Sequence, residues 1–132
     1  MRCYGFSIRL RDEEASKRYV EMHREVWPEI VGPGGALETI GVHKLQIFLI
    51  DPLTLFMYIE ADDDFEPVRE FARANTLDPR VKEWDDMMHE GPESLLVRLD
   101  HDGPTQWAPM QRIHHFDRTA TLHDLDPKQD GR

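Results

Sequence analysis

The sequence is poor in cysteine and has no long apolar run. Its 132 residues include one cysteine, Cys3, so an internal disulfide framework is excluded and a reducing compartment is expected. No stretch approaches the roughly eighteen uninterrupted apolar residues of a membrane-spanning helix. The first residues do not combine an apolar run with a small-residue cleavage site. We therefore expect a cytoplasmic protein that does not contact membranes.

Positive charge is also scarce. The chain has 16 Lys and Arg residues against 26 Asp and Glu residues, for a formal net charge of −10. A protein that binds a phosphate backbone gains affinity from a cationic surface that releases counterions. Nucleic acid is therefore not expected as a partner. The length suffices for one domain with a real core and is too short for two ordinary domains.

Several motifs that carry cofactor or nucleophile chemistry are missing. The sequence has no glycine-rich phosphate loop, dinucleotide fingerprint, cysteine pair or nucleophile elbow. It has no His-x-x-x-His pair, and His23 and Glu29 are too far apart on a helix to share one face. We therefore expect neither a metal site nor a bound cofactor.

The most strongly patterned stretch is a helical one that carries an inward histidine. His23 and Trp27 lie at the margin of its apolar face, so the His23 imidazole is expected to point inward. Such a histidine can be a packed core residue or a catalytic acid, and the periodicity leaves both readings open. The apolar face itself consists of Ala15, Tyr19, Met22, Val26 and Ile30.

Strands are expected on both sides of this helix. Residues 2–10 alternate between apolar and polar, as in a half-buried strand. The helix should begin after Asp12 and run to about Val31, with a kink or a fresh turn at Pro28, which lacks an N–H. Residues 39–50 and 53–60 then predict a hairpin that turns at Asp51-Pro52.

Two further helices and a last strand are expected in the second half. One helix should span Phe65 to about Ala74 after the capping run 62–64, and another should start at Asp78-Pro79. Residues 94–99 are too short to classify, and segment 91–109 is a possible insertion. Residues 110–116 predict the last strand, and residues 118–132 form a polar tail. The predicted domain is therefore 1–117.

The predicted order is strand, helix, strand, strand, helix, helix, strand. This order indicates an α+β fold, an antiparallel ferredoxin-like sheet packed with helices. Both arms of the predicted hairpin carry apolar residues on both faces, so both faces of the sheet should be covered. Helices cover one face, and a second copy of the chain is the simplest cover for the other. We expect a homodimer.

Five strings in the sequence together resemble the L-rhamnose mutarotase family over residues 1 to about 117. The first string is fairly specific, and the others corroborate it. The strings are Tyr19-x-x-x-His23-x-x-x-Trp27-Pro28-Glu29, Gly41-x-His43 before Ile47-Phe48-Leu49, Leu55-Phe56-x-Tyr58-x-Glu60, Pro79-x-Val81-x-x-Trp84-x-x-x-Met88, and Trp107-x-Pro109-Met110.

The resemblance implies a fold, a reaction and a set of site residues. Family members are dimeric α/β barrels of ferredoxin-like topology that interconvert the anomers of a free deoxyhexose without a cofactor. By this resemblance His23 matches the catalytic proton donor, Tyr19 a sugar-binding tyrosine, and Trp84 the first of two sugar-stacking tryptophans. Trp27 and His43, which belong to the same strings, are candidate substrate-binding residues.

The chain departs from the family pattern at two positions. Asp85 follows Trp84 where the family commonly shows a second tryptophan, and Leu45 stands where the family commonly shows a sugar-contacting tyrosine. Asp85 is itself a candidate substrate-binding residue, because a carboxylate accepts hydrogen bonds from hydroxyls. The substitutions point to a rebuilt substrate pocket.

The retained residues suit mutarotation, which opens a hemiacetal by moving one proton onto the ring oxygen and another off the anomeric hydroxyl. Histidine titrates near neutrality and can serve both transfers. We therefore expect a cofactor-independent aldose mutarotase for a sugar such as L-rhamnose or L-fucose, with His23 as general acid/base. A non-catalytic sugar-binding or interaction protein, and a cofactor-free monooxygenase of the same architecture, are the alternatives.

Overall fold

The computed structural model describes residues 1–97 and 107–118, which contain nine regular elements. They are β1 (Arg2–Arg9), α1 (Glu13–Met22), α2 (Pro28–Val31), α3 (Ala36–Thr39), β2 (Val42–Ile50), β3 (Thr54–Ala61), α4 (Pro67–Ala74), α5 (Pro79–His89) and β4 (Ala108–Met110).

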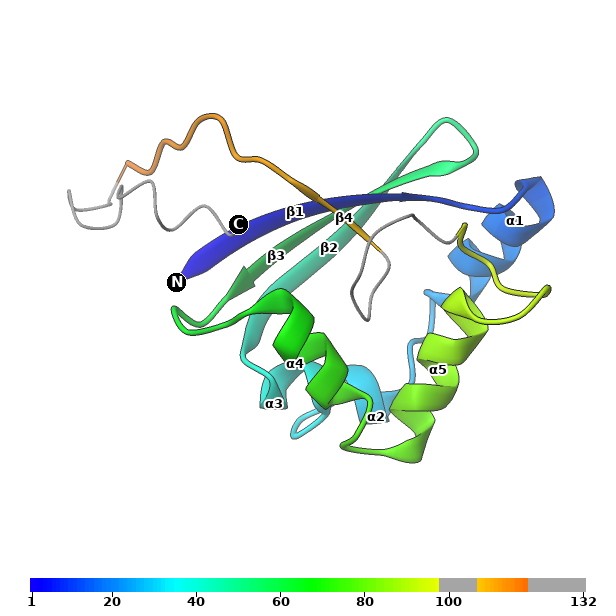
Figure 1. The fold of residues 1–132 in the computed structure, drawn as a ribbon, viewed down its shortest axis with the longest axis horizontal. Helices are drawn as coiled ribbons and strands as arrows, with labels where there is room; N and C mark the ends of the chain where they lie inside the picture. The colour runs from blue at the N-terminus through cyan, green and yellow to red at the C-terminus, as the bar shows by residue number, and fades with distance from the viewer. Residues whose placement is uncertain (98–106, 119–132) are drawn as a thin grey trace.

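One antiparallel sheet with the strand order β2-β3-β1-β4 organises the fold. The two central strands, β1 and β3, pair along their whole length, from Arg2 opposite Ala61 to Arg9 opposite Thr54. This order, with helical connections before β2 and after β3, is that of a split βαβ unit. The predicted α+β class and the antiparallel sheet packed with helices are confirmed (Figure 1).

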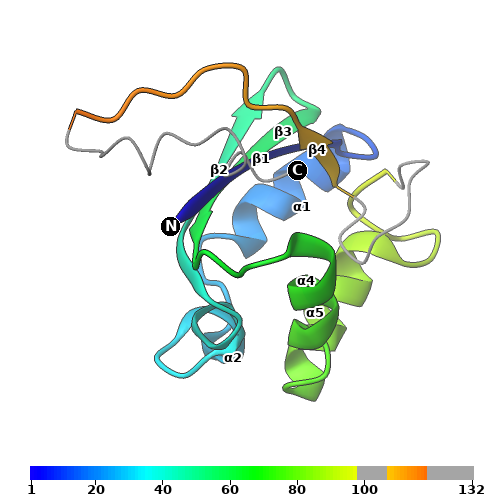
Figure 2. The same ribbon diagram turned by 60° about the vertical axis from the view of Figure 1, so that its left-hand side comes forward.

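The period of two along the strands sends one set of side chains to the helices. In β1 and β3 alternate residues are buried against them, and Ile59 is fully inaccessible. The helices lie on one side of the sheet (Figure 2). Burial on this side stabilises the domain at roughly 25 cal/mol per Å² of apolar surface. The buried strand residues are Tyr4, Phe6, Ile8, Leu55, Met57, Ile59 and Ala61.

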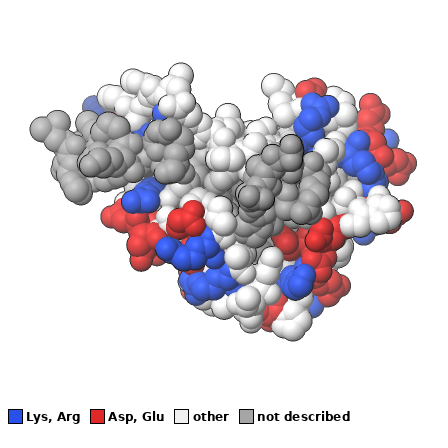
Figure 3. Space-filling view, in the orientation of Figure 1, with Lys and Arg blue, Asp and Glu red and all other residues white. Residues whose placement is uncertain are grey.

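The second face of the sheet carries no helix among the described residues, and apolar side chains on it remain accessible. Phe48 stacks on Phe56 there at 6.0 Å between ring centroids, yet Phe48 is 52% exposed. Residues 111–118 run along this side in Figure 2. In Figure 3 acidic and basic residues are interspersed over the lower part of the molecule, where α4 and α5 lie.

The predicted hairpin is confirmed, and its turn is built on Asp51. This residue has a positive φ of 45°, and its Oδ1 accepts from the backbone N–H groups of Leu53 and Thr54 at 2.8 and 3.1 Å. An aspartate tolerates this conformation because its side chain bonds the turn locally. The first arm begins at Val42, three residues later than expected, because the short helix α3 occupies Ala36–Thr39.

The continuous helix expected up to Val31 is wrong, although the fresh turn at Pro28 is confirmed. The helix α1 ends at Met22, with His23 as its C-cap residue, and α2 begins at Pro28. The residue before a proline is disfavoured in the helical region. Trp27 accordingly has an extended backbone, with φ −60° and ψ 140°. The break leaves His23 at a helix end.

Two other expected elements have different bounds. The helix α4 begins at Pro67 and is capped by Glu66, so the cap expected at residues 62–64 is wrong. The last strand covers Ala108–Met110 in place of 110–116, because of residues 107–118 only these pair with β1, opposite Gly5–Ser7. Beyond Met110 the chain leaves the sheet and has no regular secondary structure up to residue 118.

Part of the segment expected to be an insertion packs into the core. Leu95 and Leu96 are buried, Leu96 forms a bridge with Leu10, and Val97 N–H donates to the Arg9 carbonyl at 2.8 Å. Residues 98–106 of that segment, and residues 119–132 of the predicted tail, lie outside the described residues. In the described part of the chain, no helix is long and apolar enough to cross a membrane.

The cap of α5 offers a test of the fold. Asp78 accepts from the Arg80 backbone N–H at 2.8 Å through its side chain. We expect Asp78→Ala to lower the free energy of unfolding by about 1 kcal/mol in urea denaturation, because a helix N-terminal donor loses its partner. Asp78→Asn keeps a capping oxygen and should stay close to wild type. An equal loss in both variants would contradict the capping role.

Candidate functional site

The end of α1 places an imidazole against a phenol ring. Tyr19 lies one turn before His23, is 4% exposed, and stacks on the imidazole with 4.0 Å between ring centroids and 27° between planes. The backbone N–H of His23 donates to the Tyr19 carbonyl at 3.1 Å in the closing turn of the helix. The end of the helix thus holds the two rings in stacking contact.

A second hydrogen bond to the same carbonyl determines the tautomer of His23. The ring Nδ1 lies 2.7 Å from the Tyr19 oxygen. A carbonyl oxygen can only accept, so Nδ1 carries the proton and, in the neutral ring, Nε2 carries the lone pair. Among the described residues, no group forms a hydrogen bond with Nε2. The ring nitrogen that can take up a proton is therefore the one left for a ligand.

Burial keeps the His23 imidazole neutral near physiological pH. Desolvation lowers the pKa of His23, and the hydrogen bond from Nδ1 to the Tyr19 carbonyl opposes this only in part. A neutral imidazole with a free Nε2 is a general base. Once protonated there, the same nitrogen is a general acid.

The helix α5 supplies the opposite wall with an aromatic plate. Trp84 meets His23 edge to face at 5.3 Å between centroids, and it meets Trp27 in the same manner at 5.0 Å. Arg80 covers the other side of this cluster, with its guanidinium carbon 3.6 Å from the centroid of the Trp27 ring. Trp27 therefore packs between Trp84 and Arg80.

These walls enclose a small, largely apolar cavity of about 180 Å³. Sites for drug-sized ligands commonly occupy roughly 300–1,000 Å³, so this cavity suits a smaller molecule. Its polar side chains come from α1 and α5, and its floor comes from β2 and β3. The lining residues are Tyr19, His23, Val26, Ile30, Val31, Leu37, Leu45, Ile47, Met57, Phe71, Trp84, Asp85, Met88, His89, Leu96 and Trp107.

Asp85 brings a carboxyl group into this apolar cavity. Asn75 Nδ2 donates to Asp85 Oδ2 at 3.1 Å, and His89 Nε2 lies 3.9 Å from Asp85 Oδ1. Burial raises the pKa of Asp85 from its ordinary value to about 6, and the hydrogen bond from Asn75 opposes the rise. A carboxyl group with such a pKa can exchange a proton near neutrality.

The structure brings together most of the site residues predicted from the sequence. Tyr19, His23, Trp84 and Asp85 line one cavity. Trp27 does not line it but contacts Trp84. These positions agree with the helical spacing of the two segments that carry them.

His43 is not brought to this cavity. Its side chain is 51% exposed and its Nε2 pairs with Asp62 Oδ1, next to the start of β2. The local reason is the bulge between Val42 and Lys44, which shifts the register of β2 against β3 at this point. Leu45 lines the cavity instead.

Sequence reasoning missed three residues of the site. His89 lies one turn after Asp85, so extending the stripe of α5 by one turn would have found it. Trp107 comes from the chain after residue 106, and Asn75 from the connection between α4 and α5. No local pattern marks Asn75, and the string Trp107-x-Pro109-Met110 marks Trp107 without placing it in the site, because both residues reach the site through tertiary packing.

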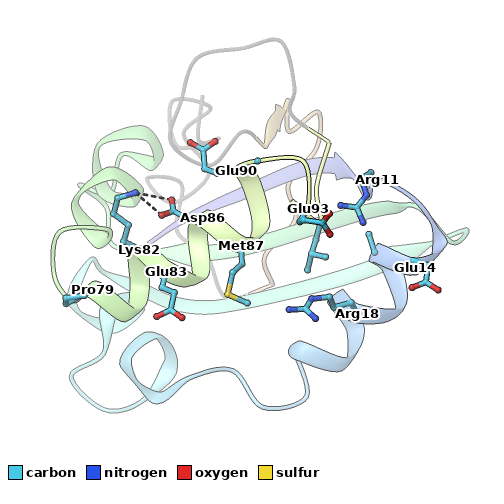
Figure 4. Close-up of a pocket in the computed structure, with 13 residues that line it drawn as sticks. Arg11, Glu14, Arg18, Pro79, Lys82, Glu83, Asp86, Met87, Glu90 and Glu93 are labelled. Carbon is cyan, nitrogen blue, oxygen red and sulfur yellow. Dashed lines mark hydrogen bonds and ion pairs between the residues drawn. The ribbon is translucent and has the colours of Figure 1, made fainter.

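A larger groove between α1 and α5 lies on the outer side of the same helices (Figure 4). It measures about 1050 Å³ and its rim is charged, with Arg11 and Arg18 on one side and Lys82, Asp86 and Glu90 on the other. Lys82 bonds Asp86 within it at 3.0 Å. The groove lacks the aromatic plates that flank His23.

Metal ligation receives no support from the geometry of the described chain. Within residues 1–97 and 107–118, no group of three or more His, Cys, Asp and Glu side chains is placed to hold a metal ion.

Comparison with known proteins relates the chain to a family and to a protein of another organism. The sequence profile of L-rhamnose mutarotase matches residues 3–116. A UPF0734 protein of Dictyostelium discoideum is 32% identical over 108 residues, which cover 82% of this chain and 83% of the relative. The range matched by the profile contains every described residue that lines the cavity.

The buried carboxyl group predicts a pH-dependent stability. The pKa of Asp85 is raised to about 6, so the folded state favours the protonated form. The stabilisation that the protonated carboxyl gives the folded state is complete below about pH 4 and is lost as the pH rises through 6. We expect Asp85→Asn, which is neutral throughout, to be more stable than wild type by about 2 to 3 kcal/mol at pH 7. The difference should vanish near pH 4.

Urea denaturation at pH 4 and pH 7 measures this difference. Asp86→Asn is the matched control, because Asp86 is the adjacent carboxylate on α5 and points to the outer groove. A stability difference between Asp85→Asn and wild type that does not change with pH would contradict the raised pKa.

Proposed function

Because the chain belongs to the L-rhamnose mutarotase family, we propose that it interconverts the anomers of a free aldose without a cofactor. The observation that carries the proposal is His23, whose Nδ1 is held by the Tyr19 carbonyl and whose Nε2 is available in a small cavity beside Trp84. His23 is the general acid/base of this reaction.

The reaction needs two proton movements and little else. Nε2 of neutral His23 takes the proton from the anomeric hydroxyl as the ring C–O bond breaks, and the ring oxygen receives a proton. After the aldehyde turns about its bond to the next carbon, the steps run in reverse and the other anomer forms. A positioned acid/base contributes roughly 10² to 10⁴ in rate.

The cavity supports a deoxyhexose such as L-rhamnose or L-fucose as the substrate. Its volume of about 180 Å³ favours one monosaccharide over a larger glycan. Trp84 presents an indole to the C–H face of a pyranose, and the aliphatic wall suits a methyl group in place of a hydroxymethyl group. Tyr19 and Asp85 are the polar side chains for the hydroxyls.

A non-catalytic sugar-binding protein is the second candidate. The observation in its favour is Leu45, which lines the cavity where the family commonly has a sugar-contacting tyrosine. Without that phenol the protein can hold a sugar but position it less well for proton transfer. Saturable sugar binding without any anomer exchange would single out this function.

The second sheet face supports a homodimer that closes as an α/β barrel. Met110 at the end of β4 is 46% exposed, and beyond β4 Ile113 and Phe116 are 91% and 78% exposed. A cavity of about 430 Å³ lies between residues 110–116 and the sheet. Exposed apolar groups of this kind mark an interaction surface, and a copy of the same chain offers a self-complementary cover.

Anomer exchange tests the proposed reaction. Magnetisation exchange between the anomeric protons of L-rhamnose and of L-fucose should be faster with wild type than in buffer. We expect His23→Ala to lower the catalysed rate by about 10²- to 10⁴-fold, because the acid/base group is removed. Retention of the wild-type rate by this variant would contradict the role of His23.

The position of His43 can be tested in the same assay. Since its side chain pairs with Asp62 outside the cavity, we expect His43→Ala to keep the substrate affinity of wild type. A raised KM in this variant would indicate that His43 contacts the substrate.

Sedimentation equilibrium tests the dimer. We expect Ile113→Asp to convert a dimer of wild type into a monomer, because a charge enters an apolar interface. Val68→Asp is the matched control, since Val68 is 51% exposed on α4, on the helical side. Equal masses for wild type and Ile113→Asp would contradict an interface at this position.

A further inference from the structure

Mutarotation needs a proton source at the ring oxygen as well as a base at the anomeric hydroxyl. His23 alone, held with one available nitrogen, serves one of these positions at a time. The other position needs a group in the same cavity that can give a proton and take it back. The following inference rests on the proposed function and concerns that second group.

Within the described residues, four side chains with titratable groups line the cavity: Tyr19, His23, Asp85 and His89. Burial raises the pKa of the Tyr19 phenol, so this phenol stays protonated at neutral pH and cannot alternate between two forms. His89 is buried, and its Nε2 faces the Asp85 carboxyl at 3.9 Å. Asp85 is the remaining group.

Asp85 is held in place by its neighbours as a reacting group must be. Asn75 Nδ2 donates to Oδ2 at 3.1 Å, and His89 Nε2 stands 3.9 Å from Oδ1, so both oxygens have a neighbour that limits rotation. Asp85 follows Trp84 on α5, and Trp84 contacts His23. The carboxyl and the imidazole therefore belong to adjoining walls of one cavity.

We propose that Asp85 is the second proton-transfer residue of the site, and that Asn75 and His89 are the residues that position it. In ring opening the Asp85 carboxyl gives its proton to the ring oxygen as the bond from this oxygen to the anomeric carbon breaks. At the same time His23 Nε2 takes the proton of the anomeric hydroxyl, which becomes the carbonyl.

The step balances without any other reactant. Opening leaves an Asp85 carboxylate, a His23 imidazolium and a neutral open-chain aldose. After rotation of the aldehyde, the carboxylate takes the proton back from the hydroxyl while the ring bond re-forms, and the imidazolium returns its proton to the carbonyl oxygen. The pair thus holds one proton in total at the start and at the end of each turnover.

The charges around the two groups agree with a shared proton. Burial raises the pKa of Asp85 to about 6 and lowers that of His23 below its ordinary value. Asp86 and Glu90 raise the pKa of Asp85 further, and Lys82 opposes them. The one-proton state of the pair therefore declines as the pH rises through 6.

Anomer exchange of L-rhamnose and L-fucose between pH 5 and 8 tests the proposal. In wild type the catalysed rate should fall as the pH rises above 6. We expect the catalysed rate of Asp85→Asn at pH 6 to be about 10²-fold lower than that of wild type. The decline above pH 6 should be absent in this variant, because only His23 then titrates. Glu83→Gln removes another carboxylate of α5, one that lines the outer groove and does not act on the pKa of Asp85, and it should keep the wild-type rate.

The outcomes separate this inference from the proposed function. If Asp85→Asn keeps the wild-type rate and pH profile while His23→Ala is inactive, the protein is a mutarotase and Asp85 is not its acid. If wild type accelerates neither sugar, both the proposed function and the role of Asp85 are overturned. Native near-ultraviolet circular dichroism of Asp85→Asn shows that the variant is folded.

Asn75→Ala tests positioning separately from folding. Because the hydrogen bond from Asn75 lowers the pKa of Asp85, its removal should move the alkaline decline of the rate to higher pH. A lower rate with an unmoved decline would mean that Asn75 is only structural, and would contradict its role on Asp85.

Discussion

The candidate site depends on one hydrogen bond at the end of a helix, from His23 Nδ1–H to the Tyr19 carbonyl. The Tyr19 carbonyl already accepts from the His23 backbone N–H in the closing turn, and its oxygen has room to accept from the side chain as well. The bond holds the imidazole against the Tyr19 ring and leaves Nε2 as the nitrogen with the lone pair. It exists because α1 ends at Met22, and the extended Trp27 before Pro28 separates that end from α2.

The other half of the site, the Asp85 carboxyl group, lowers the stability of the folded protein when it is ionised. A carboxyl group in an apolar cavity is costly when ionised, and the raised pKa of Asp85 expresses this cost. Perturbed groups of this kind cluster where chemistry occurs, although structural networks produce them as well. Here the perturbed carboxyl lines one cavity with a perturbed histidine and an aromatic plate. This combination agrees better with proton transfer than with packing alone.

The sheet serves the two sides of the molecule differently. On the helical side, alternate residues of β1 and β3 form the core, and residues of β2 and β3 form the floor of the cavity. On the other side the same alternation presents Phe48 and Phe56, which no described helix covers. The alternation of side chains along the strands therefore forms the floor of the cavity on one side. On the other side it forms the surface that a second copy is proposed to cover.

Much of the fold and half of the site could be predicted from the sequence. Helical spacing placed Tyr19 and His23 on one inward face, and alternation predicted β1 and the hairpin, because these features repeat within a few residues. The ending of α1 at Met22 and the cap at Glu66 were missed, since proline and capping act against a continuous pattern. Only the tertiary structure decided that Asn75 and His89 face Asp85 and that His43 lies apart with Asp62. Such neighbours come from different elements, and packing, which no local period encodes, selects them.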